Sequence, residues 1–367
     1  MKIACLNCGR PYPNTGVYYQ CPKCGGLYDF VGPLTIGDVD QIKPGIWRYA
    51  ASFGDQTTPI SLGEGNTPLI PGIAFGREIY FKCEYANPSG SFKDRGSATL
   101  ISFIHARGVT EAIEDSSGNA GASFAAYAAR AGIKARVYVP EDASGPKRQQ
   151  IEIYGAELVT VPGPRSNAAE AARKAAEGGM VYASHAYLPF NLPGYATCAF
   201  EIVEQLGQAP GAIVIPAGQG GLLLGIGRGF QSLLHAGKIQ KMPALIGVQA
   251  SVCAPLAALF SMGVIGLNFV TEALSLVGRA TETLAEGVRV RTPLRADAVI
   301  RITRESGGRF VTVDEGYILS GRDALARLGF YVEPTSALIW QALNETISEL
   351  SDPVVAILTG SGYKVRA

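Results

Sequence analysis

Apolar and polar positions change along the chain between two kinds of pattern. Short runs rich in apolar and β-branched residues occupy positions 111–117, 135–140, 157–161 and 180–183. Helical spacing fills the stretches between them, at about 122–131, 147–155 and 167–177. Strands that alternate with helices are typical of a parallel sheet with right-handed crossovers. The pattern predicts a small doubly wound domain over about residues 88–199.

The rest of the chain repeats this alternation less regularly. Strand-like runs cover 78–84, 212–216 and 353–358, and apolar residues at helical spacing follow the second of these runs. We expect residues 31–87 and 200–367 to build a larger α/β domain together. We expect residues 1–30 to form a third, small unit. A chain of 367 residues suits two domains and an appendage.

Charge and composition exclude several classes of partner. The 32 basic and 31 acidic residues leave a net charge of +1, so no bulk field would hold a polyanion, and nucleic acid is not an expected partner. No apolar run approaches the roughly 20 residues of a membrane-spanning helix. The first residues lack the apolar core of a signal peptide. We therefore expect a cytoplasmic protein that does not bind membranes.

Four cysteines near the start have the spacing of a metal site. Cys5-x2-Cys8 and Cys21-x2-Cys24 enclose a segment of 12 residues with the glycines and proline that tight turns need. Four thiolates complete the tetrahedral shell of Zn2+ and leave no position for water. The spacing predicts a structural zinc ribbon over residues 1–30. Disulfides are the alternative, which a reducing cytosol disfavours.

A lysine among small residues lies at the centre of the second motif. Residues 87–96 read Asn-Pro-Ser-Gly-Ser-Phe-Lys-Asp-Arg-Gly, and apolar residues at helical spacing follow them. Lys93 is therefore expected at a junction between a loop and a helix. Most lysines are solvated surface residues, and on position alone that alternative is favoured over a functional role for Lys93.

Two further loops precede predicted helices. Ser116, Ser117, Gly118 and Ala120 surround Asn119 between a strand and an alanine-rich helix, where free backbone N–H groups would bind a substrate carboxylate. The alternative is an ordinary helix cap formed by Asn119. Gly218, Gln219, Gly220 and Gly221 follow the strand at 212–216, and such consecutive glycines let backbone amides converge on a phosphate.

These motifs together resemble a known family. The stretch Ser-Phe-Lys-Asp-Arg-Gly, preceded by Gly-Glu-Gly-Asn-Thr-Pro-Leu at 63–69, is similar to the threonine synthase branch of the fold type II pyridoxal-phosphate (PLP) enzymes, the tryptophan synthase beta-like family. The resemblance runs from Gly63 to the C-terminus. It implies an α/β fold with two doubly wound parallel-sheet domains, PLP in the cleft between them, and a homodimer.

The resemblance also implies a role for several residues. Lys93 would hold PLP covalently and, once released, act as the base that removes the α-proton of a small amino-acid substrate. Asn119 would bind the oxygen on the cofactor ring, and Gly218–Gly221 its phosphate. Thr359, in the segment Thr-Gly-Ser-Gly-Tyr, would bind the pyridine nitrogen, with Ser361 as the alternative. The implied reaction is elimination or replacement, as in the conversion of O-phosphohomoserine to threonine.

The sequence departs from the family at the expected phosphate site of the substrate. Ala120 replaces a threonine, and Leu-Pro-Phe-Asn-Leu-Pro-Gly-Tyr-Ala at 188–196 lacks the arginine and the lysine of the family's segment. A dianion would lose its bidentate partner. A threonine or serine dehydratase is therefore an alternative, and a non-catalytic ligand-binding homologue is another. His105, His185 and His235 are too scattered to predict a catalytic dyad.

Overall fold

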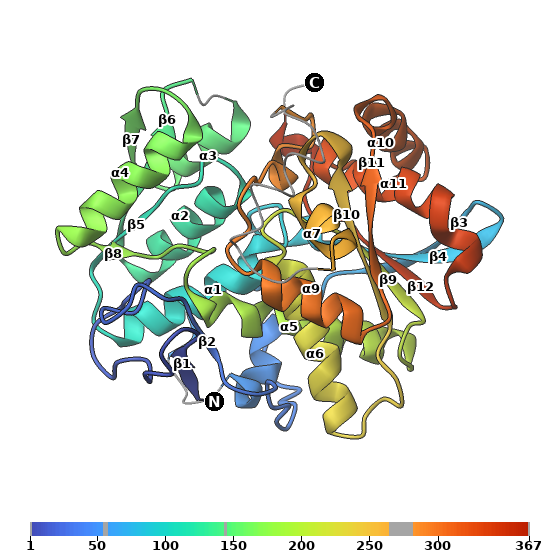
Figure 1. Ribbon diagram of the computed structural model, residues 1–367, viewed down its shortest axis with the longest axis horizontal. Coiled ribbons are helices and arrows are strands. Elements are labelled where there is room, and N and C mark those ends of the chain that lie inside the picture. Colours follow the sequence, from blue (N-terminus) through green and yellow to red (C-terminus); the bar gives the residue numbers. More distant parts are fainter. Residues whose placement is uncertain (1, 54–57, 143–144, 264–281, 366–367) are drawn as a thin grey trace. The chain divides into compact units, whose positions relative to one another are not determined.

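Contacts along the backbone divide the chain into two units, which we describe one at a time (Figure 1). The first unit contains Met1–Gly65, Asn87–Gly194 and Lys364–Ala367, and the second contains Asn66–Ala86 and Tyr195–Tyr363. The computed structural model describes residues 2–53, 58–142, 145–263 and 282–365.

The sheet of the first unit has four strands in the order β7-β6-β5-β8, and all neighbouring pairs are parallel. The strands are β5 (Glu111–Glu114), β6 (Lys134–Pro140), β7 (Glu157–Val161) and β8 (Val181–Tyr182). Each lies within or close to one of the four runs identified in the sequence. The alternation of apolar runs with helical spacing therefore predicted this parallel sheet correctly.

Four helices connect these strands or precede them. They are α1 (Lys93–Ala106), α2 (Asn119–Ala131), α3 (Pro146–Ile153) and α4 (Arg165–Glu177). The connections through α2 and α3 step from β5 to β6 and then to β7, whereas the connection through α4 returns across the sheet to β8. Right-handed crossovers then place α4 on the opposite face from α2 and α3. The direction of winding changes between β5 and β8, which is the switch point of this sheet.

Residues 31–65 also belong to the first unit by their contacts, whereas the sequence analysis grouped residues 31–87 with the second. Ile46, Trp47 and Ile60 belong to the same hydrophobic core as α1 and α2, and the buried carboxyl group of Glu64 adds polar contacts. It accepts hydrogen bonds from Trp47 Nε1 at 2.7 Å and from Tyr127 Oη, in α2, at 2.6 Å. The hydroxyl of Ser61 and the amide of Leu62 also donate to it. The carboxyl group of Glu64 therefore links the segment around Trp47 to α2.

The second unit contains a sheet of six strands in the order β11-β10-β9-β12-β4-β3. Its strands are β3 (Leu69–Ala74), β4 (Arg77–Lys82), β9 (Ala212–Pro216), β10 (Ala244–Ala250), β11 (Arg309–Val313) and β12 (Val354–Ile357). All neighbours are parallel except the β3–β4 hairpin at the edge. β9 and β12 are fully buried, as their continuous apolar sequences require.

Helices surround this sheet, and its winding also reverses once. The helices are α5 (Leu192–Leu206), α6 (Gly221–His235), α7 (Pro255–Ser261), α9 (Ala296–Glu305), α10 (Ile318–Arg327) and α11 (Pro334–Thr346). From β9 the chain winds outward to β10 and β11, and it then returns to place β12 on the other side of β9. The switch point of this sheet therefore lies between β9 and β12.

A buried lysine joins β4 to α5 within the second unit. Lys82 Nζ lies 2.8 Å from Glu201 Oε2, and both side chains are almost completely excluded from solvent. The ammonium also donates to the carbonyl of Thr67 and to Gln205 Oε1. Three acceptors satisfy its three N–H groups, so burial of this charge is compensated. Among the described helices, none is long and apolar enough to cross a membrane.

The Glu64 contacts predict a specific loss of stability. Tyr127→Phe removes one donor and leaves the carboxyl group buried, and such a loss costs about 1–3 kcal/mol. We expect the free energy of unfolding, measured with urea, to decrease by this amount. Tyr138→Phe in β6 is the matched control, because no described residue bonds its hydroxyl group, and it should change stability by less than about 0.5 kcal/mol. Equal effects of the two substitutions would contradict the role assigned to Glu64.

Candidate active site and metal centre

Lys93 is the first residue of α1, as the sequence predicts, and its side chain is half-buried. The N-termini of α1 and α2 and the carboxyl end of β5 all lie on one edge of a parallel sheet, because each helix runs opposite to the strands it connects. The Lys93 ammonium acts electrostatically on Glu114, the last residue of β5. The first unit thus brings Lys93 to the switch point of its own sheet.

Asp94 fixes the loop that carries Lys93. Its buried carboxyl group accepts bonds from the amide and the hydroxyl of Ser89, at 2.6 and 2.5 Å, and from the hydroxyl of Ser123 in α2, at 2.6 Å. Burial raises the pKa of Asp94 to about 6, although these bonds and the Lys364 ammonium oppose the shift. Asp94 therefore anchors the loop before Lys93 to the first turn of α2.

The serine-rich turn before α2 provides the second predicted element of the site. Gly118 is the N-cap residue of α2 without a side-chain cap, and its amide donates to Ser116 Oγ at 3.2 Å. Among the described residues, the amides of Ala120 and Gly121 have no hydrogen-bond acceptor. A Cβ atom at Gly121 would lie 1.8 Å from the carbonyl oxygen of Ser116, so only glycine allows this turn. Ser116, Ser117, Asn119 and Ala120 lie together at a helix N-terminus suited to an anion.

An orphaned hydroxyl group lies two residues before Lys93. Ser91 is completely buried, and its Oγ has no hydrogen-bond partner within the described residues. A buried polar atom without a partner costs about 1–3 kcal/mol, so such atoms usually meet a ligand or water. The first unit therefore fits a polar group held next to Lys93.

The glycine loop of the second unit has the form of an anion cradle. It follows β9 and ends at Gly220, the N-cap of α6, whose φ is +77°. A Cβ atom at Gly218 would lie 2.6 Å from the carbonyl oxygen of Gly287, and one at Gly220 would lie 2.6 Å from Val299 Cγ2. Within the described part of the chain, the amides of residues 218–223 donate no backbone hydrogen bond. Gln219 uses its Oε1 to accept the amide of Leu294. This loop fits a phosphate group.

Thr359 follows β12, and the glycine loop follows β9. These two adjacent strands form the switch point of the second sheet. Thr359 Oγ1 lies 2.9 Å from Ser336 Oγ, which also accepts the amide of Gly360. Ser361 is buried as well, and its Oγ accepts the amide of Tyr363. The second unit thus brings Gly218–Gly221 and Thr359 to one edge of its sheet, at the carboxyl ends of the adjacent strands β9 and β12.

One pair of side chains was missed by the sequence analysis. Glu114 ends β5, His185 comes three residues after β8, and the imidazole Nδ1 lies 2.6 Å from Glu114 Oε1. A glutamate at the end of an apolar strand, directly before the serine-rich turn, was the available signal. The pair lies at the switch point that Lys93 also shares.

Residues 188–196, which lack the arginine and the lysine of the resembled family's segment, are buried. Asn191 Nδ2 donates to the carbonyl of His185 at 2.6 Å, and its Oδ1 has no partner among the described residues. Arg165, at the start of α4, acts electrostatically on both Glu114 and His185. Arg165 and Lys93 are therefore two cations whose charges influence this region.

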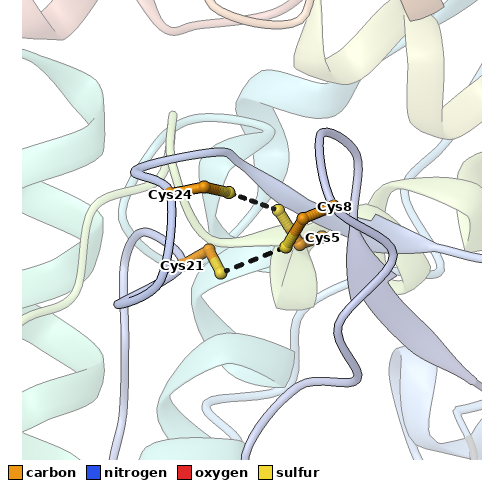
Figure 2. Close-up of side chains that lie close together, drawn as sticks. All are labelled: Cys5, Cys8, Cys21 and Cys24. Atoms are coloured by element: carbon orange, nitrogen blue, oxygen red, sulfur yellow. Dashed lines mark hydrogen bonds between the residues drawn. The ribbon is translucent and has the colours of Figure 1, made fainter.

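The four predicted metal ligands come together in the ribbon (Figure 2). β1 (Ile3–Cys5) and β2 (Tyr28–Phe30) pair antiparallel, and the sulfur atoms of Cys5, Cys8, Cys21 and Cys24 all lie within 4.8 Å of one another. Tetrahedral zinc with bonds of about 2.3 Å requires sulfur atoms about 3.8 Å apart. The distances of 3.5 Å between Cys5 and Cys24 and 3.7 Å between Cys8 and Cys21 fit this geometry.

Two equivalent turns build this cluster. The amide of Gly9 donates to Cys5 O, and the amide of Gly25 donates to Cys21 O, with φ near +69° at both glycines. The ribbon also packs against the rest of the first unit: Tyr12 contacts Phe190 edge to face at a centroid distance of 5.1 Å. The ribbon therefore supports the segment that contains His185 and Asn191.

Comparisons with known proteins agree with the resemblance in the sequence. A family model described as pyridoxal-phosphate dependent enzyme matches residues 60–360. A threonine synthase of Methanocaldococcus jannaschii is 33% identical and covers 99% of this chain and 93% of its own. Another from Synechocystis sp. is 36% identical over 87% of this chain and 82% of its own.

Solved structures extend the comparison to the fold. A threonine deaminase from the organism abbreviated T.th. aligns with a TM-score of 0.67 and 27% identity, covering 82% of this chain and 94% of that one. An L-serine ammonia-lyase from Rhizomucor miehei aligns with a TM-score of 0.71 at 20% identity, over 85% of this chain and 96% of that one. The second likeness concerns the fold alone.

The ribbon geometry predicts one zinc ion per chain. Cys8→Ser should reduce the zinc content from about one to near zero, because three thiolates bind the ion far more weakly than four. Cys253→Ser is the control, since Cys253 is a buried cysteine outside the cluster. Elemental analysis after dialysis measures both variants. A zinc-free wild type, or equal loss in the control, would contradict the assignment.

Proposed function

The chain belongs to the family of pyridoxal-phosphate dependent enzymes, and we propose that it catalyses elimination or replacement on a small amino acid, in the manner of a threonine synthase. The relatives with that name support the proposal because they match the chain over most of its length. The observation that carries it is the position of Lys93, at the N-terminus of α1 beside the switch point of a parallel sheet.

Each unit contributes groups that suit one part of the cofactor. Lys93 supplies the amine that holds PLP, and Asn119 supplies an amide for the ring oxygen. The cradle of Gly218, Gln219, Gly220 and Gly221 supplies N–H donors for the phosphate, and Thr359 supplies a hydroxyl for the pyridine nitrogen, with Ser361 as the alternative. When bound, PLP takes up the electron pair left at the substrate α-carbon.

The protein groups then handle the substrate and its protons. The N-terminus of α2, with Ser116, Ser117, Gly118 and Ala120, binds the substrate carboxylate through its N–H groups and partial positive charge. Lys93, when it is not bound to the cofactor, takes the proton from the α-carbon. Asp94 keeps Lys93 in place through its bonds to Ser89 and Ser123.

A second candidate reaction is elimination of water, as in a threonine or serine dehydratase. Ala120 and Asn191 are neutral where the family carries groups for a substrate phosphate, and Asn191 is buried with one oxygen unpaired among the described residues. A buried dianion without charged partners would cost several kcal/mol. This segment therefore favours a hydroxyl as the leaving group.

The proposal includes the remaining partners. Zinc is a structural ion bound by Cys5, Cys8, Cys21 and Cys24, without a place in the reaction. The cytoplasm is the proposed compartment, because it keeps these thiols reduced. A homodimer, with no nucleic-acid or membrane partner, is the proposed state in solution.

The two reactions predict different substrate profiles. Wild-type protein loaded with PLP should be tested in parallel with O-phosphohomoserine, threonine, serine and O-phosphoserine. The assays follow phosphate release, threonine formation and keto-acid formation. We expect turnover of at least one of these amino acids, and loss of that turnover by at least about 10³-fold in Lys93→Ala, because the base is removed.

The profile decides between the two reactions. Threonine formed from O-phosphohomoserine identifies the synthase reaction, and keto acid formed from threonine or serine without phosphate identifies the dehydratase. Lys238→Ala, an exposed lysine after α6, is the matched control and should retain full activity. A wild type that takes up PLP but turns over none of these substrates would contradict both reactions.

A further inference from the structure

The pair formed by Glu114 and His185 connects the carboxyl ends of two adjacent strands. β5 ends at Glu114, β8 ends three residues before His185, and the two strands pair directly in the sheet. The 2.6 Å contact joins His185 Nδ1 to Glu114 Oε1 across 71 residues of sequence. This is the position where open α/β sheets bind their ligands.

The carboxyl group of Glu114 has a very different environment from that of Glu64. Glu64 accepts bonds from four residues, whereas Glu114 is 1% exposed and its Oε2 has no partner among the described residues. Burial raises the pKa of Glu114 to about 8, although Lys93, Arg165 and the backbone N–H groups of His185 and Asp115 oppose the shift. At neutral pH this carboxyl group is therefore protonated.

The imidazole of His185 is neutral under the same conditions. Burial lowers its pKa well below the usual value, and the charges of Lys93 and Arg165 lower it further, while Asp115 acts in the opposite direction. A protonated Glu114 donates to Nδ1, so the ring carries its own proton on Nε2. The imidazole is 16% exposed, and no described residue bonds Nε2. The pair thus holds one proton that can leave through Nε2.

The charged and titratable groups that act on the pair come from several elements of the first unit. Lys93 belongs to α1, Arg165 to α4, and Asp115 follows β5. Tyr182, in β8, forms a hydrogen bond with Asp115. Burial and the carboxyl group of Glu114 both raise the pKa of Asp115. The two cations stabilise the pair after it has lost its proton, because the pair then carries one negative charge.

We propose that Glu114 and His185 together exchange a proton with the oxygen atom on the side chain of the amino-acid substrate. This inference rests on the proposed function and assigns the site a second proton carrier besides Lys93. A hydroxyl group leaves poorly without a proton, whereas a phosphate group leaves without one. The pair therefore favours substrates that lose or gain a hydroxyl group.

The proton and electron balance of the step is simple. Lys93 takes the α-proton, and the electron pair left at the α-carbon, which bound PLP would hold, then forms the carbon–carbon double bond as the C–O bond breaks. The oxygen keeps the electrons of the C–O bond, takes the proton from His185 Nε2 and leaves as water. The proton of Glu114 moves to Nδ1, which leaves a carboxylate. Addition of water is the same transfer in reverse.

Nuclear magnetic resonance of the imidazole nitrogens tests the pair directly, with or without substrate. The chain has three histidines, so labelled spectra are simple, and His185→Gln assigns the signal. Below about pH 8 we expect the proton of a neutral His185 on Nε2, and above it on Nδ1, because Glu114 loses its proton near that pH. In Glu114→Gln this change of tautomer should be absent.

Kinetics supply the second measurement. The kcat of the loaded wild type should decline as the pH rises through about 8, because the pair then has no proton to give. Glu114→Gln should lower kcat by about 10²–10⁴-fold and remove this limb of the profile, as expected for loss of a general acid. Glu111→Gln, at the exposed start of the same strand, is the matched control and should retain both the rate and the profile.

The outcomes separate this inference from the proposed function. If the wild type fails to take up PLP, the proposed function is wrong, whereas the tautomer measurement still applies to the pair. If PLP uptake and turnover are normal but Glu114→Gln retains the pH profile, or the tautomer does not change near pH 8, the inference is wrong. PLP uptake that stays within about twofold in Glu114→Gln, together with the lost limb, supports it.

Discussion

The common edge formed by helix N-termini and strand ends is the constraint on which the rest of this structure depends. Parallel strands joined by right-handed crossovers place every carboxyl end on one side of the sheet, and the next helix begins there. In the first unit this edge collects Lys93, the turn before Asn119, and Glu114. In the second unit it collects Gly218–Gly221 and Thr359. Each sheet reverses its winding once, and the candidate residues lie at that reversal.

Two buried glutamates of the first unit differ in the number of hydrogen-bond donors around their carboxyl groups. This difference distinguishes the structural role of Glu64 from the chemical role that we propose for Glu114. Glu64 accepts from Trp47, Tyr127, Ser61 and Leu62, so its contacts hold separate segments together. Glu114 contacts the imidazole of His185 and the backbone N–H groups of His185 and Asp115, and its Oε2 lacks a partner among the described residues. The contacts of Glu64 hold separate segments together, and those of Glu114 suit the proton transfer that we propose.

The sequence predicted what depends on local pattern. Apolar runs identified all four strands of the first sheet but only β4, β9 and β12 of the second, whereas β3, β10 and β11 were not predicted. Lys93 was placed at a helix start, and the cysteine spacing predicted the cluster of four sulfur atoms. The sequence did not predict the contact between Glu114 and His185, because this contact depends on β8 lying beside β5, and strand order is not a local property. The sequence also did not predict that residues 31–65 group with the first unit, because this depends on the core that Ile46 and Trp47 join and on the long-range bonds of Glu64.

We propose that Lys93 holds the cofactor, and the lysine that PLP modifies can be mapped. Borohydride reduces the link between a lysine and PLP to a permanent bond, which peptide mass spectrometry then locates. We expect a single pyridoxyl group, on the peptide that contains Lys93. Lys82, Lys147 and Lys364 are buried, whereas Lys93 is half-buried, and these three lysines serve as internal controls. A pyridoxyl group on any of them in place of Lys93, or on no lysine, would contradict the role proposed for Lys93.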